Sequence, residues 1–486
     1  MSFINLDLSM NDEFDNQLFS ERHEFKGTLS KGGISVNNLQ IFIEYSLVSV
    51  GHIKGKITGD ASVYKEIQKI FELPGVYCEL RSVAPKPRQI EISSNKVIIT
   101  SIKGKSSDMV YHIADLRFDE LIIVEPHGKE RRYERELIFF LSDSKMIWDV
   151  GGSIERSVSG DIKRSLSNSK IELNESFPFD IEIYPYHYYK NISLPKSYEI
   201  TTDVMSLHMR TKKSKEDLSD DVFLEMGEGL CKDLLLLISF VARSRISWFR
   251  YRFQADSFLK EYVLKVSESL PVNNDVYDCA VEYHEIRKFI KVALTRFRRL
   301  RDEGFNLFWA MNHYVSTKEA KYLEQKYSTL FMALEQIKDL FAKKEGLDKI
   351  LPDNEFRELK KPIIKMINDN IMDEAKSIRI NEKILELNRY PLNYLLDLVF
   401  DRYKVEWRNL YPPGSERTLV STRNNLFHSS KKVEIDHLAK EYYRLQAILE
   451  RIIYGLLGWS DYSRSPGMGI KTWLAANDEK KPLVDK

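Results

Sequence analysis

The side chains most suited to chemistry lie near the C-terminal end of the chain, in the run RNNLFH at 423–428. Ser415 is a good helix N-cap and Glu416 suits a first turn, so we expect a helix from about 416. At about 100° per residue, Arg423 then falls near the middle of an apolar stripe. The stripe consists of Leu419, Val420, Leu426 and Phe427.

An arginine on an apolar face must be paired in a buried salt bridge or must line a polar cleft. Asn424 and His428 lie one helical turn apart at the edge of the same stripe. Histidine moves protons near neutral pH, and arginine binds phosphate and offsets charge that develops on it. The sequence therefore leaves two interpretations of Arg423, a structural ion pair and an active-site cation.

A histidine and an arginine together suit phosphodiester cleavage without a metal. RNA carries its own nucleophile, the ribose 2′-OH, whereas DNA does not, so the predicted substrate is RNA. One histidine cannot easily serve as both acid and base. A two-fold dimer would bring a second histidine to the same cleft.

The RNNLFH run resembles the R-x4-6-H motif of HEPN ribonucleases, in the form with a polar residue after the arginine. The helical pattern around it, at about 315–460, is also similar to HEPN domains. A long β-rich region followed by a C-terminal HEPN domain resembles the ApeA-type proteins of bacterial anti-phage defence. This resemblance implies a metal-independent, dimeric RNase that acts in abortive infection, often on tRNA. By motif match it assigns catalysis to Arg423 and His428 and a site-shaping role to Asn424.

The elements that must position these residues follow from the hydrophobic pattern. An amphipathic helix at Lys318–Lys343 carries Glu335 at the edge of its apolar face. Glu335 could pair with Arg423, orient His428, or simply be a surface residue. Further helices are expected at about 354–371, 392–407 and 436–457, and short connections favour a four- or five-helix bundle.

A second candidate lies on the helix predicted at 281–301. Its apolar face is regular, and its other faces are strongly basic. The basic residues that we single out as possible RNA contacts are Arg296, Arg298, Arg299 and Arg301. They form either an ordinary solvated face or a track for a phosphate backbone.

The N-terminal half is predicted to be β-rich. Short apolar strands with turn signals fill residues 1–205 and predict a sandwich or an open barrel. Ser93-Ser94-Asn95 reads as the turn of a hairpin between Ile90–Ile92 and Val97–Ile99. The expected fold class is thus α+β, with a β-rich domain at 1–205, a mixed connecting region at 206–314, a helical bundle at 315–460 and a tail at 461–486.

Composition limits the remaining classes. The chain has 486 residues and a formal net charge of +1, so no global field drives nucleic-acid binding. The three scattered cysteines form no disulfide framework, and no signal peptide or long apolar run is present, which predicts a cytoplasmic protein without a membrane span. No HExxH motif or Cys/His cluster with zinc spacing occurs, so we expect no metal and no cofactor.

We therefore expect a HEPN endoribonuclease whose partners are RNA, a second copy of the chain and a phage-encoded trigger or inhibitor. Two alternatives stay open. One is a non-catalytic HEPN scaffold used for dimerisation, in which Arg423 is only structural. The other is a nucleic-acid-binding regulator that uses the basic helix.

Overall fold

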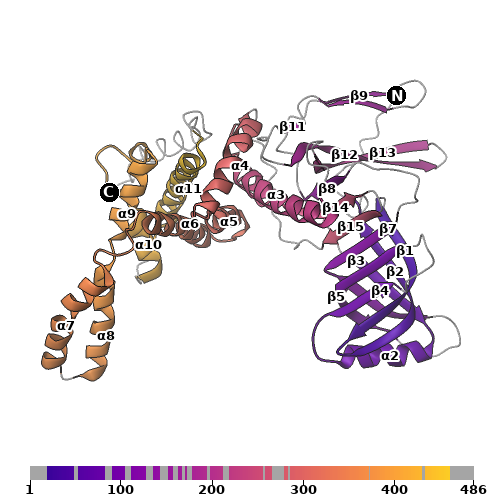
Figure 1. Ribbon diagram of the computed structural model, residues 1–486, viewed down its shortest axis with the longest axis horizontal. Coiled ribbons are helices and arrows are strands. Elements are labelled where there is room, and N and C mark those ends of the chain that lie inside the picture. Colours follow the sequence, from indigo (N-terminus) through magenta and orange to yellow (C-terminus); the bar gives the residue numbers. More distant parts are fainter. Residues whose placement is uncertain are drawn as a thin grey trace, which may run out of the picture. The chain divides into compact units, whose positions relative to one another are not determined.

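The chain folds into two compact units. In the computed structural model they are Met1–Leu235 with Ile246–Asn274, and Leu236–Arg245 with Asp275–Lys486. The residues described are 19–48, 53–82, 90–103, 111–126, 135–142, 152–156, 162–166, 170–171, 178–193, 197–211, 218–255, 258–264, 279–282, 285–371, 373–428 and 433–459. The first unit is mainly strands and the second mainly helices, so the expected α+β class is confirmed (Figure 1).

The first unit is built on antiparallel strands. Its strands are β1 (Ser20–Lys31), β2 (Ile34–Ser46), β3 (Ile53–Gly59), β4 (Cys78–Ser82), β5 (Glu91–Ile102), β6 (Tyr111–Phe118), β7 (Glu120–Pro126), β8 (Glu136–Leu141), β9 (Gly152–Arg156), β10 (Ile162–Leu166), β11 (Lys170–Ile171), β12 (Phe179–Ser193), β13 (Ser197–Thr211), β14 (Trp248–Gln254) and β15 (Phe258–Leu264). Its helices are α2 (Ala61–Glu72) and the first part of α3 (Asp220–Val241).

Six of these strands close into a barrel in the order β1-β2-β3-β6-β5-β4, with β4 returning to β1. Closure depends on β6, which pairs with β3 on one side and with β5 on the other. Of the two predicted alternatives, the sandwich is therefore wrong for this part of the chain, and the barrel is present but closed rather than open. The pattern of short strands is the same in open and closed sheets, so the sequence could not distinguish them.

The predicted hairpin at Ser93-Ser94-Asn95 is also wrong, because β5 runs straight through it. Ser94 is buried and its hydroxyl donates a hydrogen bond of 2.7 Å to the carbonyl of Glu120. The strand changes partner at this point, from β7 at residues 91–93 to β6 at residues 97–102. The polar residues thus mark the place where the barrel closes rather than a turn.

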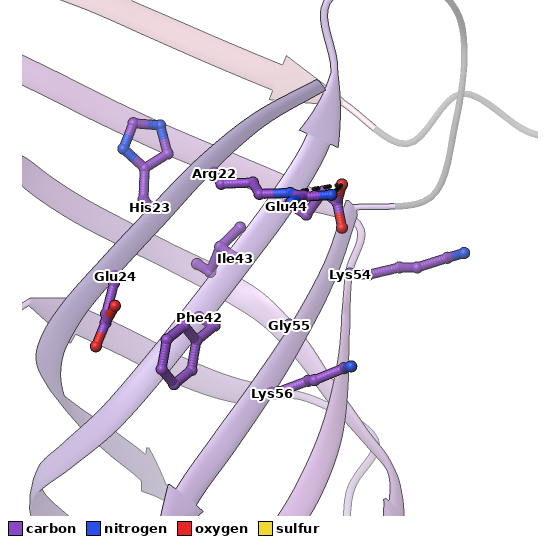
Figure 2. Close-up of a pocket in the computed structure, with 9 residues that line it drawn as sticks. All are labelled: Arg22, His23, Glu24, Phe42, Ile43, Glu44, Lys54, Gly55 and Lys56. Carbon is purple, nitrogen blue, oxygen red and sulfur yellow. Dashed lines mark hydrogen bonds and ion pairs between the residues drawn. The ribbon is translucent and has the colours of Figure 1, made fainter. Parts of the chain in front are cut away.

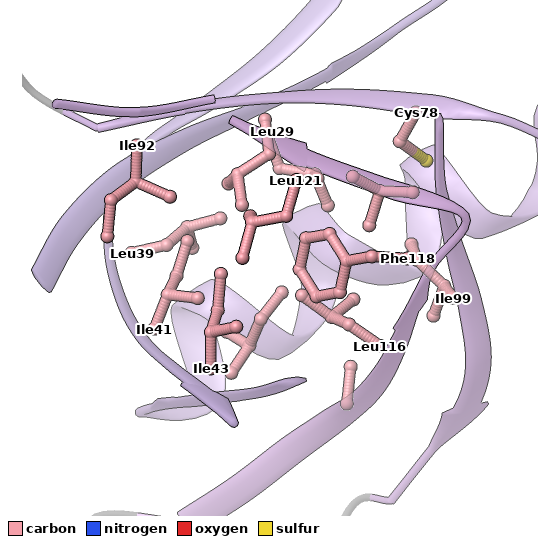
Figure 3. Close-up of a cluster of buried hydrophobic side chains, with 14 of the residues drawn as sticks. Leu29, Leu39, Ile41, Ile43, Cys78, Ile92, Ile99, Leu116, Phe118 and Leu121 are labelled. Carbon is pink, nitrogen blue, oxygen red and sulfur yellow. The ribbon is translucent and has the colours of Figure 1, made fainter. Parts of the chain in front are cut away.

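The barrel core is filled by the inward-facing alternate residues of its strands. Ile41 and Ile43 of β2 and Phe118 of β6 are almost completely buried, and Figure 3 shows them converging in the interior. Helix α2 contacts β2, β3 and β6 through its buried Ile67 and Ile70. Asp60 caps this helix by accepting hydrogen bonds from the backbone N–H groups of Ser62 and Val63.

The sheet continues beyond the barrel through β7, β15, β14, β8, β13, β12 and β11, while β9 and β10 form a separate two-stranded sheet. Strand β13 runs through the boundary predicted at 205/206, because its pairing with β8 continues to Arg210 and its pairing with β12 to Thr211. The predicted connecting region, 206–314, is divided. Strands β14 and β15 join the sheet of the first unit, and α4 onward belongs to the second.

The second unit is helical. Its elements are α4 (Ile286–Asp302), α5 (Phe308–Ser316), η4 (Thr317–Glu319), α6 (Leu323–Lys344), α7 (Asp353–Asn370), α8 (Glu374–Ile384), η5 (Leu385–Asn388), α9 (Leu392–Arg402), η6 (Arg408–Leu410), α10 (Leu419–His428) and α11 (Ile435–Leu457). The predicted helices correspond to α4, α6, α7, α9, α10 and α11, with ends that shift by a few residues.

Helix α11 lies at the centre of this unit and contacts α4, α6 and α10. Helix α6 contacts α5, α9, α10 and α11, so α6 and α11 together form the frame that holds α10. Helices α7 and α8 pair with each other as a hairpin that extends from the other helices of the unit (Figure 1). The predicted tail at 461–486 lies outside the described residues.

No helix in the described ranges combines the length and the apolar character that crossing a membrane requires. The three cysteines, Cys78, Cys231 and Cys279, are buried free thiols.

Candidate active site

Helix α10 begins three residues later than the sequence pattern predicts. The predicted cap, Ser415, uses its hydroxyl to bond the carbonyl of Pro412 at 2.7 Å, so it does not cap the helix. Arg417 lies against the rings of Phe400 and Trp407, at 4.8 and 5.2 Å from their centres. The stacked Arg417 fixes the approach to the helix, and the first intrahelical bond runs from the N–H of Thr422 to the carbonyl of Thr418.

The burial of Leu419 and two hydrogen bonds fix the position of α10 in the bundle. Leu419, its first residue, is completely buried, and its carbonyl accepts a hydrogen bond of 2.7 Å from the hydroxyl of Tyr327 on α6. One turn later, the hydroxyl oxygen of the buried Thr422 lies 2.9 Å from Nε2 of His437 on α11. The helix is therefore held on two sides before the motif residues begin.

Arg423 lies at the edge of the packed face, with 27% of its side chain exposed. Its Nη2 is 3.3 Å from Oε1 of Glu335 on α6, whose side chain is 31% exposed. The guanidinium also lies 5.9 Å from the ring centre of Phe331 and 5.5 Å from that of Phe427. Arginine and glutamate are thus brought together, as one of the sequence alternatives proposed, in a place that solvent reaches.

Asn424, Asn425 and Phe427, which follow Arg423 in the motif, are exposed. Asn424 is exposed and its Oδ1 accepts a hydrogen bond of 3.2 Å from Nη1 of Arg423. His428 is the last residue of α10, one turn after Asn424, and its side chain lies outside the described part of the structure. The expectation that Phe427 belongs to a buried stripe is wrong, because 53% of it is exposed.

This arrangement presents a fixed cation beside polar groups at the end of a helix. The carboxylate of Glu335 and the amide of Asn424 orient the guanidinium, which stays 27% exposed. A guanidinium that solvent reaches suits the binding of an anion such as a phosphate. Within the described ranges, no group of three or more His, Cys, Asp or Glu residues is placed to hold a metal ion.

The four arginines of the basic helix do not form one free surface. Arg296 donates from Nε to the carbonyl of Leu456 at 3.3 Å, near the C-terminal end of α11. Arg299 pairs with Glu303 at 2.9 Å, and Glu303 also pairs with Lys344. Arg298 and Arg301 are half-buried. Of the nearby aromatic residues, Phe305 is buried, whereas Trp309 is 63% exposed and available for stacking.

Sequence reasoning missed a buried ion pair in the second unit. Arg243 binds Glu450 of α11 through two hydrogen bonds of 2.7 and 2.8 Å, and both side chains are at most 3% exposed. Tyr314 and Gln446 also donate to this carboxylate. Burial, followed by the carboxylate charge, raises the pKa of Tyr314 well above its usual value. This cluster is enclosed, so it links Arg243 and Tyr314 to α11 inside the bundle and offers nothing to a substrate.

A signal for this cluster was present in the sequence. Leu449, Ile453 and Leu457 form a second buried apolar stripe on α11 beside the one made by Leu445, Ile448 and Ile452. A helix that is apolar on most sides is surrounded by protein, so its charged residues must find buried partners.

Comparisons of the chain with protein-family models, with curated proteins and with solved structures find no match. The function of the protein must therefore be inferred from the geometry of the motif helix.

Proposed function

We propose that this protein is a metal-independent endoribonuclease of the HEPN type, with Arg423 and His428 as its catalytic residues. The observation that carries the proposal is the placement of Arg423, a solvent-accessible cation oriented by Glu335 and Asn424 on the same helix as His428. The association of α6, α9, α10 and α11 supports a HEPN-like bundle.

In the proposed reaction, Arg423 binds the scissile phosphate. His428 takes the proton of the ribose 2′-OH, whose oxygen attacks phosphorus, and the bond from phosphorus to the 5′ oxygen breaks. The histidine of a second copy gives a proton to that leaving oxygen. The products are a 2′,3′-cyclic phosphate and a 5′-hydroxyl end.

Several wider features belong to the same proposal through the HEPN resemblance. The enzyme acts as a homodimer in the cytoplasm, cleaves tRNA or other cellular RNA, and serves as an abortive-infection effector. The β-rich first unit senses a phage protein or restrains the ribonuclease, and a phage-encoded protein triggers or inhibits the enzyme.

The test is cleavage of total cellular RNA in EDTA by the wild-type protein and by His428→Ala. The matched control is His313→Ala, which removes a half-buried histidine of α5 in the same unit. We expect discrete cuts by the wild type and the control and a loss of at least about a hundredfold in His428→Ala. The cut ends, mapped by sequencing, identify the target RNA.

If the wild type alone is silent, the assay is repeated with extract from phage-infected cells to supply a trigger. Cleavage that is equal in wild type and His428→Ala under both conditions would contradict the proposed chemistry.

A further inference from the structure

A groove lies on the outer face of the barrel in the first unit, far along the chain from the motif helix. It has a volume of about 630 Å³ and runs over β1, β2 and β3 (Figure 2). Ile41 and Ile43 of β2 point into the barrel core, so the alternate residues Phe42 and Glu44 face outward. The groove is therefore a surface that the barrel core does not require.

Strand register arranges the outward side chains in two rows across the strands. Arg22, Glu44 and Lys54 occupy one row, since Glu44 pairs with Arg22 on one side and with Lys54 on the other. Glu24, Phe42 and Lys56 occupy the next row in the same way. Figure 2 shows the two lysines extending side by side from β3.

The charged side chains of this face differ in the contacts that they make. Glu44 accepts two hydrogen bonds from Arg22, at 2.9 and 3.0 Å, and a third from Ser20. Partial burial raises the pKa of Glu44, but these hydrogen bonds outweigh that effect and the pKa lies below its usual value. Glu24 accepts from Gln40 at 2.6 Å. Among the described residues, no carboxylate lies within ion-pair distance of Lys54 or Lys56, both of which are exposed.

Phe42 supplies an aromatic surface between these charges, with 37% of the residue exposed in the middle of a strand. The residues opposite Phe42 on β1 and β3 are Glu24 and Lys56. The ring therefore has no aromatic neighbour in its own row across the strands. An exposed ring beside two cations can stack on a planar group while the cations hold its negative charge.

The backbone of these strands is not available to a ligand. Strand β2 pairs with both β1 and β3, and the ring of strands closes, so a peptide cannot add as a further strand here. A ligand must be recognised by side chains, namely one ring and two amines. A planar base that carries a phosphate meets both requirements, whereas an acidic peptide meets only the second.

We propose that this groove binds a nucleotide unit, with the base stacked on Phe42 and the phosphate held by Lys54 and Lys56. The unit is either a free nucleotide or part of a single-stranded nucleic acid. A volume of about 630 Å³ lies within the usual range for small-molecule sites, roughly 300–1,000 Å³. The proposal does not depend on RNA cleavage, because the groove and the motif helix belong to different units.

The test is the fluorescence anisotropy of a labelled single-stranded DNA decamer titrated with the full-length protein. DNA lacks the 2′-OH, so the proposed ribonuclease activity cannot consume it. We expect Phe42→Ala to weaken binding roughly tenfold and Phe42→Trp to retain it. The double variant Lys54→Ala/Lys56→Ala should lower the slope of log K against log salt by about 0.7, because the two lysines hold one phosphate.

Matched controls come from helix α2 of the same unit. Phe71→Ala removes a phenylalanine that is 48% exposed, and Lys65→Ala/Lys69→Ala removes two exposed lysines. These variants should bind as the wild type does. Competition with AMP separates the two sources: displacement at concentrations similar to those of the decamer identifies a free nucleotide, and failure to displace identifies a strand.

The proposal is overturned if the wild type binds neither decamer nor AMP, or if groove and control variants lose binding equally. His428→Ala should bind the decamer as tightly as the wild type, whatever its effect on RNA. The binding measurement can therefore be interpreted even if no RNA cleavage is observed. RNA cleavage can likewise be interpreted even if the decamer does not bind.

Discussion

The exposure of Arg423 decides what its ion pair contributes. A pair with 27% and 31% of its side chains exposed is screened by water and adds only about 0–1 kcal/mol to stability. A fully buried pair broken on one side typically costs about 3–5 kcal/mol. A buried structural salt bridge is therefore a better description of the pair Arg243–Glu450 than of the pair Arg423–Glu335.

Replacing Arg423 with alanine should consequently separate activity from stability. We expect the free energy of unfolding to fall by about 1 kcal/mol or less, because the ion pair is partly solvated. RNA cleavage should fall by at least about a hundredfold, since the transition state loses a cation that offsets its charge. Urea unfolding and single-turnover cleavage measure the two effects.

Arg245→Ala is the matched control, because Arg245 pairs with Glu319 in the same unit at similar exposures of 34% and 29%. It should show a comparable loss of stability and unchanged cleavage. A loss of about 3–5 kcal/mol in Arg423→Ala, with no change in cleavage, would favour the scaffold alternative instead.

At the scale of elements, the position of α10 depends on contacts made before the motif begins. The Tyr327 hydroxyl holds the carbonyl of Leu419, and Thr422 meets His437 one turn later. Neither Tyr327 nor Thr422 belongs to the proposed catalytic pair. A small shift of the helix would nevertheless move Arg423 away from its working position.

The variant Tyr327→Phe tests this role of the helix start. It keeps the buried ring but removes the side-chain hydrogen bond to the Leu419 carbonyl, which should cost about 0.5–1.5 kcal/mol. We expect kcat for RNA cleavage to fall roughly tenfold and KM to change little, because Tyr327 positions the helix and does not touch RNA.

The control is Tyr322→Phe, which alters a tyrosine that is 57% exposed just before α6. This variant should match the wild type in stability and cleavage. If Tyr327→Phe lowered stability without any effect on kcat, the hydrogen bond would be structural only and α10 would be held by its other contacts.

For the molecule as a whole, the sequence predicted individual helices better than it predicted how strands distant in the chain pair. Periodicity located α6 and α11 because each buries a regular apolar stripe. It missed the closure of the barrel and the passage of β5 through Ser94, because both depend on hydrogen bonds to strands distant in the chain. It placed Glu335 at the edge of the apolar stripe and gave pairing with Arg423 as one of three alternatives, and this is the contact that the structure has. The late start of α10 required knowledge of the stacked Arg417.

The response of the first unit to acid follows from a carboxylate at the end of the barrel strand β1. The His23 imidazole, 3.6 Å away, lowers the pKa of Glu21 to about 2, with help from the Tyr45 hydroxyl and against the effect of burial. A carboxylate whose pKa is depressed by folding stabilises the native state above its unfolded pKa, about 4.3. That contribution is lost as the pH falls from about 4.3 toward 2.

The variant Glu21→Gln should therefore be less stable than the wild type near pH 6, and the difference should shrink as the pH approaches 2. Urea unfolding at a series of pH values, followed by circular dichroism, measures both curves. Glu24→Gln, a change on the same strand, is the control for the loss of one negative charge. Parallel curves for the wild type and Glu21→Gln down to pH 2 would show that the Glu21 carboxylate is not the group that couples folding of this strand to protons.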